Sequence, residues 1–437
     1  MAYTETTATS WFSRLGNAFK GILIGIVLVI IATALLFWNE GRLIKRYRAL
    51  DQAEGECIEV SANVVNKVNE GALVYLTGSA KTDDVLSDPI FGVSTPAIHL
   101  VRRVEMYQWE ETSSTSTTTQ VGGGEKSETT YSYSKVWSAS HIDSSAFKQS
   151  GHDNPATFPY EGQSFVAKNV RLGAFSLSPS LVGMIGPLEP YSVPEPSKVE
   201  PQNTDVIPVE PLPTQTTPAD AESTESESTS DVASEETAPV ETPAPEVPAP
   251  EAPVSEESAS EEPAFRWENG GFYHGENSAA PQIGDVRVRF EYVPQTKEVS
   301  VVSEQHGETF VPHQTPNGTV ELLENGLVSK EMMFANARSS NAILGWLLRA
   351  VGFVMMWIGF SMIFNPFKVL ADVIPLLGNI VGFGVGMFSF LLAAIVSLVT
   401  IAIGWLYFRP IIAIPLLVLA GVLLLYTLLG GRAKRKV

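Results

Sequence analysis

Four long runs of apolar residues dominate the pattern of this 437-residue chain. One lies near the N-terminus at 21–38, where 18 residues carry no charge. As a helix, such a run is long enough to cross about 30 Å of hydrocarbon. The other three lie near the C-terminus, at 343–364, 380–408 and 410–430. The pattern therefore predicts an integral membrane protein with four transmembrane helices, one before and three after a large polar region.

The segment before the first run, 1–20, changes from polar to amphipathic. Trp11, Phe12, Leu15 and Phe19 recur at helical spacing, which predicts a short interfacial helix that leads into the membrane. A cleaved signal peptide is the competing interpretation of the first run. The bulky residues at the end of the run argue against it, because a cleavage site needs small residues.

Charged residues constrain the three C-terminal runs. Arg349 lies inside the second run, so either its side chain reaches the membrane surface or the hydrocarbon-facing part begins near Ala350. Arg409 and Pro410 separate the third run from the fourth, because proline cannot continue a helix. The tail at 431–437 is basic and is expected in the cytoplasm.

Between the first and second runs the pattern becomes that of a β-rich domain, whose first part is 39–183. Stretches rich in β-branched and aromatic residues alternate with turn signals. They cover Leu73–Leu76, Ile98–Trp109, Tyr131–Trp137 and Ser164–Phe175. Residues 112–130 are rich in Ser, Thr and Gly and are expected to form a long hairpin loop.

The second part of the domain is 264–338. Asp285–Val293 alternates strictly between apolar and charged residues, which predicts a strand with one buried face. We expect Lys297–Val302 and Glu308–Val311 to continue the same sheet. Glu321–Arg338 is expected to be a helix that leads into the second apolar run. The fold class is therefore an α+β membrane protein.

The segment 184–263 separates the two parts of the domain. It is rich in Pro, Glu, Ser, Thr and Ala, and it lacks enough large apolar residues to offset the loss of chain entropy on folding. Pro187–Glu262 carries 19 acidic residues and one basic residue, a net charge of −18 out of −19 for the whole chain. We expect a disordered acidic insertion into one domain, or a linker between its two halves.

Composition narrows the possible chemistry. The folded remainder is nearly neutral and shows no basic face, which argues against nucleic-acid binding. One cysteine, Cys57, permits neither a disulfide within the chain nor a thiolate zinc site. Its acidic neighbours Glu56 and Glu59 are expected to raise the pKa of the thiol. The six histidines have no metal-binding spacing, so we predict no metal and no cofactor. The stretch 122–127 lacks the spacing of a phosphate-binding loop.

At the start of the third apolar run and just before it, Gly378, Gly382 and Gly386 recur every four residues. This spacing of small residues lets helices approach closely, so the stripe predicts a packing or self-association face. The alternative is that these glycines only loosen the start of a helix.

Several stretches together resemble the transmembrane protein 43 family, also called LUMA. The resemblance covers most of the chain outside the acidic segment and the termini. The matching stretches are Phe37–Arg42, Leu86–Pro89 with Phe91–Val93, Arg102–Trp109, Tyr131–Tyr133 with Trp137, Gly151-His152 with Asn154-Pro155, Phe272–His274 with Glu276-Asn277, Gly284-Asp285 with Arg287-Val288, and Gly404–Leu406 with Arg409-Pro410. The residues that we single out in them as structural or interaction positions are Asn39, Glu40, Gly41, Arg42, Arg102, Arg103, Glu105, Tyr107, Trp109, His152, Tyr273, His274, Arg409 and Pro410.

The resemblance implies a protein with both termini in the cytoplasm and its large domain in a lumen. Animal members of the family lie in the endoplasmic reticulum and inner nuclear membrane, associate with lamins and emerin, and self-associate. A bacterial member would lie in the inner membrane with a periplasmic domain. Charge alone leaves the sidedness open, since Arg42, Lys45, Arg46 and Arg48 follow the first run and oppose the basic C-terminal tail.

Three functions are compatible with the sequence. The first is a non-enzymatic scaffold that self-associates and organises membrane or envelope protein complexes. The second is a lipid-handling or hydrolytic enzyme that uses His152, His274 or Glu276. The third is a transporter or channel, against which the small number of intramembrane charges and the lack of an inverted repeat argue. The scaffold is the interpretation that we favour.

Overall fold

The computed structural model describes residues 3–195, 265–411, 414–415 and 418. Three long helices in this part of the chain are apolar enough to cross a membrane. They are α1 (Trp11–Glu56), α3 (Lys330–Ala371) and α4 (Pro375–Phe408). The predicted fourth span, 410–430, lies almost entirely outside the described residues. The basic tail, 431–437, and nearly all of the acidic segment also lie outside them.

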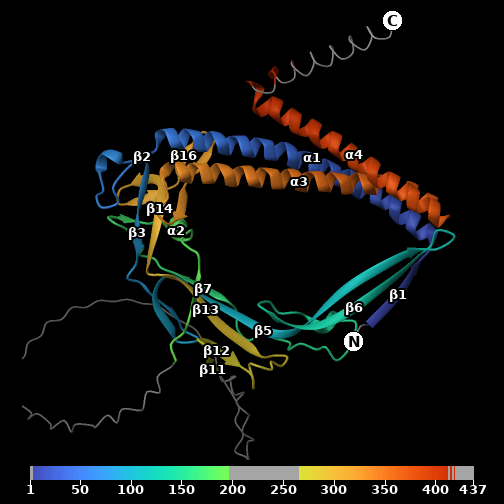
Figure 1. Cartoon of the computed structure of the whole chain (residues 1–437), viewed down its shortest axis with the longest axis horizontal. Helices are drawn as coiled ribbons and strands as arrows, with labels where there is room; N and C mark the ends of the chain where they lie inside the picture. Colours follow the sequence, from blue (N-terminus) through green and yellow to red (C-terminus); the bar gives the residue numbers. More distant parts are fainter. Residues whose placement is uncertain (1–2, 196–264, 412–413, 416–417, 419–437) are drawn as a thin grey trace, which may run out of the picture. The chain divides into compact units, whose positions relative to one another are not determined.

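The β-rich region consists of two larger sheets and one small hairpin (Figure 1). The nine-stranded sheet contains β1 (Tyr3–Thr9), β4 (Val85–Asp88), β5 (Val93–Thr119), β6 (Glu125–Ser138), β7 (Gln163–Val166), β10 (Glu189–Tyr191), β11 (Arg266–Glu268), β12 (Gly271–His274) and β13 (Val286–Pro294). The seven-stranded sheet contains β2 (Ile58–Glu59), β3 (Leu73–Lys81), β8 (Arg171–Leu172), β9 (Phe175–Ser176), β14 (Thr296–His306), β15 (Thr309–Val311) and β18 (Leu322–Asn325). The hairpin pairs β16 (His313–Thr315) with β17 (Gly318–Val320), and the short helices are α2 (Pro179–Val182), η1 (Lys67–Asn69) and η2 (Ser144–Ala146).

The strands before and after the acidic segment belong to the same sheets. β13 pairs with β5 in antiparallel register, and β14 pairs with β3 in the same way. Apolar side chains of both sheets, among them Leu76, Ile98, Val288 and Val301, form one continuous core. The two parts of the β-rich region are therefore one domain, into which the acidic segment is inserted.

The structure differs from the sequence predictions at the ends of several elements. Tyr3–Thr9 is a strand paired with β6, and α1 begins at Trp11 and continues through the membrane run without a separate interfacial helix. Residues 112–130 are mostly strand, because Thr and Ser side chains pair across β5 and β6, and the loop is confined to 120–124.

Two further predictions for the second part of the domain were wrong, one for a sheet and one for the start of a helix. Lys297–Val302 and Glu308–Val311 fall in the seven-stranded sheet, whereas Asp285–Val293 falls in the nine-stranded one. The predicted helix over Glu321–Arg338 begins at Lys330, after β18. Ser329 accepts a hydrogen bond from the Met332 amide and caps its N-terminus.

Glycines on both helices let α1 and α3 lie side by side (Figure 1). A Cβ added to Gly359 would lie 2.9 Å from the carbonyl oxygen of Gly25, and one added to Gly352 would lie 2.7 Å from the Leu36 side chain. Gly345 lies against Leu43 in the same way. Small residues at such positions allow close contact between membrane helices, where the hydrophobic effect does not drive association.

A buried ion pair fixes the centre of the nine-stranded sheet. Arg102 Nη1 lies 2.7 Å from Asp88 Oδ2, and both side chains are at most 3% exposed. Arg102 also donates to the carbonyl oxygen of Glu161, and Asp88 accepts hydrogen bonds from the Ile90 and Phe91 amides. The resemblance singled out this arginine, and the structure gives its partner.

We expect Arg102→Met to lower the free energy of unfolding by about 3–5 kcal/mol, because it leaves the Asp88 carboxylate buried without a counter-charge. The adjacent Arg103→Met is the matched control. Arg103 pairs with Glu291 on the surface, with its side chain 56% exposed, so the expected loss is below about 1 kcal/mol. Chemical unfolding of the two variants in detergent compares them, and equal losses would contradict this account.

Candidate functional site

A buried polar cluster joins the three described membrane helices at the end of the first apolar run. Glu40 of α1 is fully buried, and both of its carboxylate oxygens accept from Arg349 of α3, at 2.7 and 2.9 Å. Trp405 of α4 donates its indole N–H to the same carboxylate at 2.9 Å. A bidentate arginine–carboxylate pair with a third donor satisfies most of the polar atoms of this site.

The other residues of the Asn39–Arg42 stretch extend the cluster along α1 and α3. Asn39 donates to the carbonyl oxygen of Gly345 at 3.0 Å. Arg42 donates to the side-chain oxygen of Asn341 at 3.0 Å, and Asn341 donates in turn to the carbonyl oxygen of Leu43. Asn39–Arg42, one of the stretches that resemble the family, is therefore a part of α1 that forms hydrogen bonds with α3.

Two glycines allow α4 to approach this cluster. A Cβ added to Gly404 would lie 3.0 Å from Cβ and Cγ of Glu40, and one added to Gly41 would lie 2.6 Å from the Phe408 ring. A side chain at Gly41 would therefore displace the Phe408 ring, and one at Gly404 would require Glu40 to move by a few tenths of an ångström. The resemblance included Gly41 and Gly404, but their role depends on contacts between helices that are far apart in the sequence.

The structure gives Arg349 a partner that the sequence did not reveal. Its guanidinium is directed to Glu40 on the neighbouring helix α1, which lies within hydrogen-bond distance. Its side chain is only 13% exposed, and it also stacks on Trp346, 4.8 Å from the ring centre. Pairing inside the bundle removes the reason for the charge to reach water.

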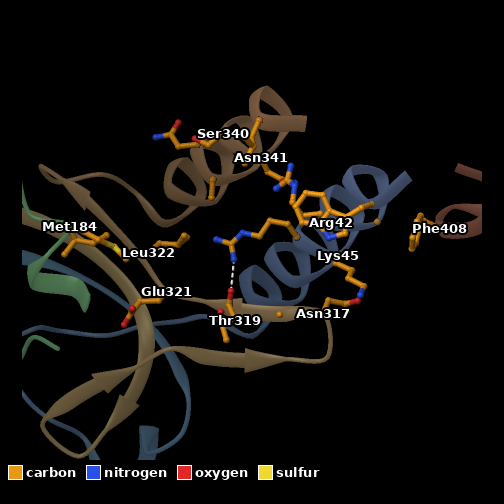
Figure 2. A pocket seen from close by; sticks show the side chains of 18 of the residues that line it. Arg42, Lys45, Met184, Asn317, Thr319, Glu321, Leu322, Ser340, Asn341 and Phe408 are labelled. Carbon is orange, nitrogen blue, oxygen red and sulfur yellow. Dashed lines mark hydrogen bonds between the residues drawn. The ribbon is translucent and has the colours of Figure 1, made fainter. Parts of the chain in front are cut away.

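Beside the polar cluster is a cavity of about 870 Å³, which we call the boundary cavity (Figure 2). α1 contributes Arg42, Lys45 and Arg46 to it, and the β16–β17 hairpin contributes Asn317 and Thr319. Figure 2 shows Lys45 of α1 near the hairpin residue Asn317, and Arg42 of α1 near Asn341 of α3. Arg46 donates to the carbonyl oxygen of Thr319 at 2.6 Å.

In the β domain, other residues of the matched stretches form an aromatic cluster. His152 stacks on Tyr133, with ring centres 4.0 Å apart, and meets Trp109 edge-on at 4.6 Å. Asn154 holds the strand beside them by accepting from the Trp109 amide and donating to its carbonyl oxygen. Lys135 lies over the Trp109 ring. These contacts are those of a packing cluster, in which the histidine is held between aromatic rings.

The remaining matched residues of the sheet pair across its strands. Arg287 contacts Glu105 at 2.6 Å and lies over the Trp137 ring, which also packs against Tyr107. Tyr273 donates to Asp285 at 2.6 Å. Burial, followed by this hydrogen bond to a carboxylate, raises the pKa of Tyr273 above its ordinary value.

His274 lies on β12 beside Phe265, away from the aromatic cluster around His152. The histidines proposed for an enzymatic site therefore have separate surroundings. Among residues 3–195 and 265–411, no group of three or more His, Cys, Asp or Glu side chains could hold a metal ion.

Cys57 follows α1 directly and packs among Leu73, Val302 and Phe334. Burial raises the pKa of its thiol to about 11, and Glu54 adds to the shift. The predicted direction is confirmed, but the principal cause is burial and not the neighbouring Glu56 and Glu59. The thiol stays protonated near neutral pH, which makes it a poor nucleophile.

The glycine stripe of α4 faces the end of α3. A Cβ at Gly382 would contact the Lys368 side chain, and Gly378 lies directly against Asp372. Gly386 has no atom within 4 Å of an added Cβ, although its carbonyl oxygen accepts from Trp357 of α3. At the other end of α4, Arg409 lies over the Tyr47 ring, and Pro410 lines a second cavity with it.

We expect Arg349→Met to destabilise the helix bundle by about 3–5 kcal/mol, because Glu40 is left buried and unpaired. The double variant Glu40→Leu with Arg349→Met is expected to recover at least half of that loss, since it removes the orphaned charge. Lys20→Met is the control. Lys20 is exposed and lies on α1, the helix of Glu40, so its replacement is expected to change the stability of the bundle little. Thermal unfolding in detergent distinguishes these outcomes, and a double variant less stable than Arg349→Met would contradict the proposed pairing.

Comparison with known proteins agrees with the resemblance. The family model described as Transmembrane protein 43 matches residues 106–410. Transmembrane protein 43 of Rattus norvegicus is 30% identical over 422 residues, which cover 93% of this chain and 89% of the relative. The protein of the same name from Homo sapiens is 30% identical over 428 residues, 95% and 90% of the two chains. The homolog from Drosophila melanogaster is 26% identical over 409 residues, 91% of each.

No solved structure matches this chain. The family model covers more than half of the chain, and the relatives align over almost all of it. The chain belongs to the transmembrane protein 43 family of membrane proteins.

Proposed function

We propose that this protein is a non-enzymatic membrane scaffold that self-associates and holds other membrane or envelope proteins together. The observation that carries the proposal is the firm attachment of the large β domain to the membrane helices. Such an attachment is what a scaffold needs in order to present a binding surface at a fixed position above the bilayer.

The attachment is formed by a second apolar core. Ala49, Leu50 and Ala53 of α1 pack against Leu73 of β3 and Phe334 of α3. Arg338 of α3 pairs with Asp51 at 3.0 Å and also contacts Glu54. Domain strands and helix ends thus share one core and one ion-pair cluster, which favours movement of domain and helices as a unit.

The membrane helices leave most of their apolar surface uncovered in the described part of the chain. Less than a quarter of the residues in each apolar stretch are buried. On α1 the exposed side chains, among them Leu23, Val27 and Ile30, follow helical spacing and form one face. This face is available to lipid or to a second copy of the chain.

Self-association predicts disulfide-linked dimers through this face. In a Cys57→Ser background, Ile30→Cys places a thiol at a position that is 62% exposed. Ala32→Cys, two residues away and fully buried, is the matched control. After mild oxidation in native membranes, we expect dimers on denaturing gels for position 30 and at least fivefold fewer for position 32. Monomers at both positions, together with a monomeric mass in nanodiscs, would refute the proposal for this face.

The partners that we propose follow from family membership. In an animal cell they would be proteins of the lamin and emerin type in the endoplasmic reticulum or inner nuclear membrane. In a bacterium they would be envelope proteins at the inner membrane. We also propose the sidedness of the family, with both termini cytoplasmic and the large domain luminal or periplasmic.

Contacts at the N-terminal end of α1 constrain this sidedness. Arg14, which is 8% exposed, pairs with Asp372 after α3 and with Glu125 of β6, at 2.5 and 2.7 Å. The amide of Gly122, in the tip of the β5–β6 hairpin, donates to the carbonyl oxygen of Val373. The hairpin tip thus lies at the opposite end of α1 from Arg42, about 42 Å away along the helix.

A membrane-spanning α1 therefore requires the β5–β6 hairpin to extend to the same side as the N-terminus. Thr112–Thr118 of β5 are hydroxyl-bearing and exposed on both faces, which is incompatible with direct contact to lipid. Such a strand pair needs protein or water around it at that depth. Neighbouring copies in an oligomer would supply this environment, which links the sidedness to the proposed self-association.

Single cysteines in the Cys57→Ser background test the sidedness. We expect positions 6 and 121 to react with a membrane-impermeant maleimide from the cytoplasmic side, because β1 and the hairpin tip are in contact with the same helix end. Position 168, exposed on the β domain, is expected to react from the opposite side only. Labelling of all three positions from one side would refute the proposed sidedness.

A further inference from the structure

The boundary cavity combines unpaired cations with an apolar wall. Among the described residues, Arg42, Lys45 and Arg46 form no ion pair, although all three line the cavity. Nε and Nη2 of Arg42 are buried and have no hydrogen-bond partner there. Buried donors without acceptors are rare and destabilising, more so when they are charged. An anion in the cavity would remove that cost.

The carboxylates of the cavity do not neutralise these cations. Glu321 and Glu324 lie on the strand side and accept hydrogen bonds from Ser303 and Asn336, at 3.3 and 3.0 Å. Arg46 is directed to the carbonyl oxygen of Thr319. The helix side of the cavity is therefore the cationic side: Arg42 donates to Asn341 of α3, and Figure 2 shows Lys45 extending toward the hairpin residue Asn317.

The apolar wall of the cavity continues the exposed apolar surface of the membrane helices. Phe37, Trp38, Leu344 and Phe408 line the same cavity, and Trp38 is 57% exposed. Phe37 and Trp38 end the first apolar run, and Arg46 follows about 12 Å further along α1. Aromatic residues followed by basic ones are typical of the headgroup level of a bilayer. The cavity thus changes from apolar to cationic along the axis of α1.

We propose that the boundary cavity binds one phospholipid, whose phosphate is held by Arg42, Lys45 and Arg46 while the start of its acyl chains lies along Phe37, Trp38 and Phe408. The guanidinium fork of Arg42 matches the oxygen spacing of a phosphate, and a turn of the guanidinium toward the cavity would pair its two buried, unpaired nitrogens. A volume of about 870 Å³ accommodates a headgroup and its glycerol, with the rest of the chains in the bilayer. The three cations favour an anionic headgroup over a zwitterionic one, because choline would add a fourth positive charge.

This site goes beyond the scaffold function, and its test does not depend on self-association. The full-length chain is purified in an uncharged detergent, stripped of lipid, and titrated separately with phosphatidylglycerol, phosphatidylcholine of the same chains, and inorganic phosphate. Native mass spectrometry reports the bound species. The expected result for the natural sequence is one phosphatidylglycerol per chain, bound at least tenfold more tightly than phosphatidylcholine.

Variants separate the site from non-specific attraction. Lys45 makes no hydrogen bond or ion pair within the described residues, so Lys45→Glu is expected to fold normally and to weaken phosphatidylglycerol binding at least tenfold. Lys168→Glu, the same charge change on the surface of the β domain, is expected to stay within twofold of the natural sequence. Arg42→Gln is expected to lose the preference for the anionic lipid, and its thermal midpoint shows whether it folds.

Three outcomes of the titrations would overturn the proposal, and a competition experiment adds a fourth. They are equal binding of the two lipids, an unchanged affinity in Lys45→Glu, and displacement of bound lipid by inorganic phosphate at equal molar concentration. The third would assign the cavity to a soluble anion, because it would show that the acyl chains add nothing. If excess soluble peptide with the sequence of residues 187–262 displaced the lipid, the cavity would instead belong to the acidic segment of the chain, which would also overturn the proposal.

Discussion

The buried pair between Glu40 and Arg349 is the interaction on which the rest of this structure depends. A carboxylate and a guanidinium inside a helix bundle are stable only as partners, since either charge alone would carry a large desolvation penalty. Their pairing fixes the height of α1 against α3, and the bond from Trp405 adds α4 to the same level. Because a helix is rigid, the position of the helix ends follows from this contact.

The helix ends in turn determine the position of the β domain. α1 continues beyond the polar cluster as Ala49, Leu50 and Ala53, which pack into the second apolar core. The turns of α1 just before these residues contribute Arg42, Lys45 and Arg46, the cations of the boundary cavity. Attachment of the domain and formation of the cavity are thus two consequences of one helix register. A shift of α1 by one residue would rotate Arg42 away from Asn341. It would disrupt both the packing of α1 on the β domain and the lining of the cavity.

The elements with strong periodicity were predictable, and their partners were not. The apolar runs at 21–38 and 343–364 lie within α1 and α3, and the alternation over Asp285–Val293 is strand β13. The glycines singled out in α4 were noticed because they recur every four residues. Gly345, Gly352 and Gly359 of α3 were missed, although they recur every seven residues and hold α1 close. Spacing indicates a face of a helix, but only the facing helix shows whether that face is used.

The amino-acid sequence was enough to identify an α+β membrane protein with a split β-rich domain and nearly all of its net charge in one segment. Local periodicity and composition are sufficient for that, because each depends on residues close together in the chain. The folded chain was needed to find that Arg349 pairs with Glu40, that His152 lies between aromatic rings, and that Arg42, which has two unpaired nitrogens, lines a cavity. These facts depend on residues tens to hundreds of positions apart, whose proximity is set by packing and not by spacing along the chain.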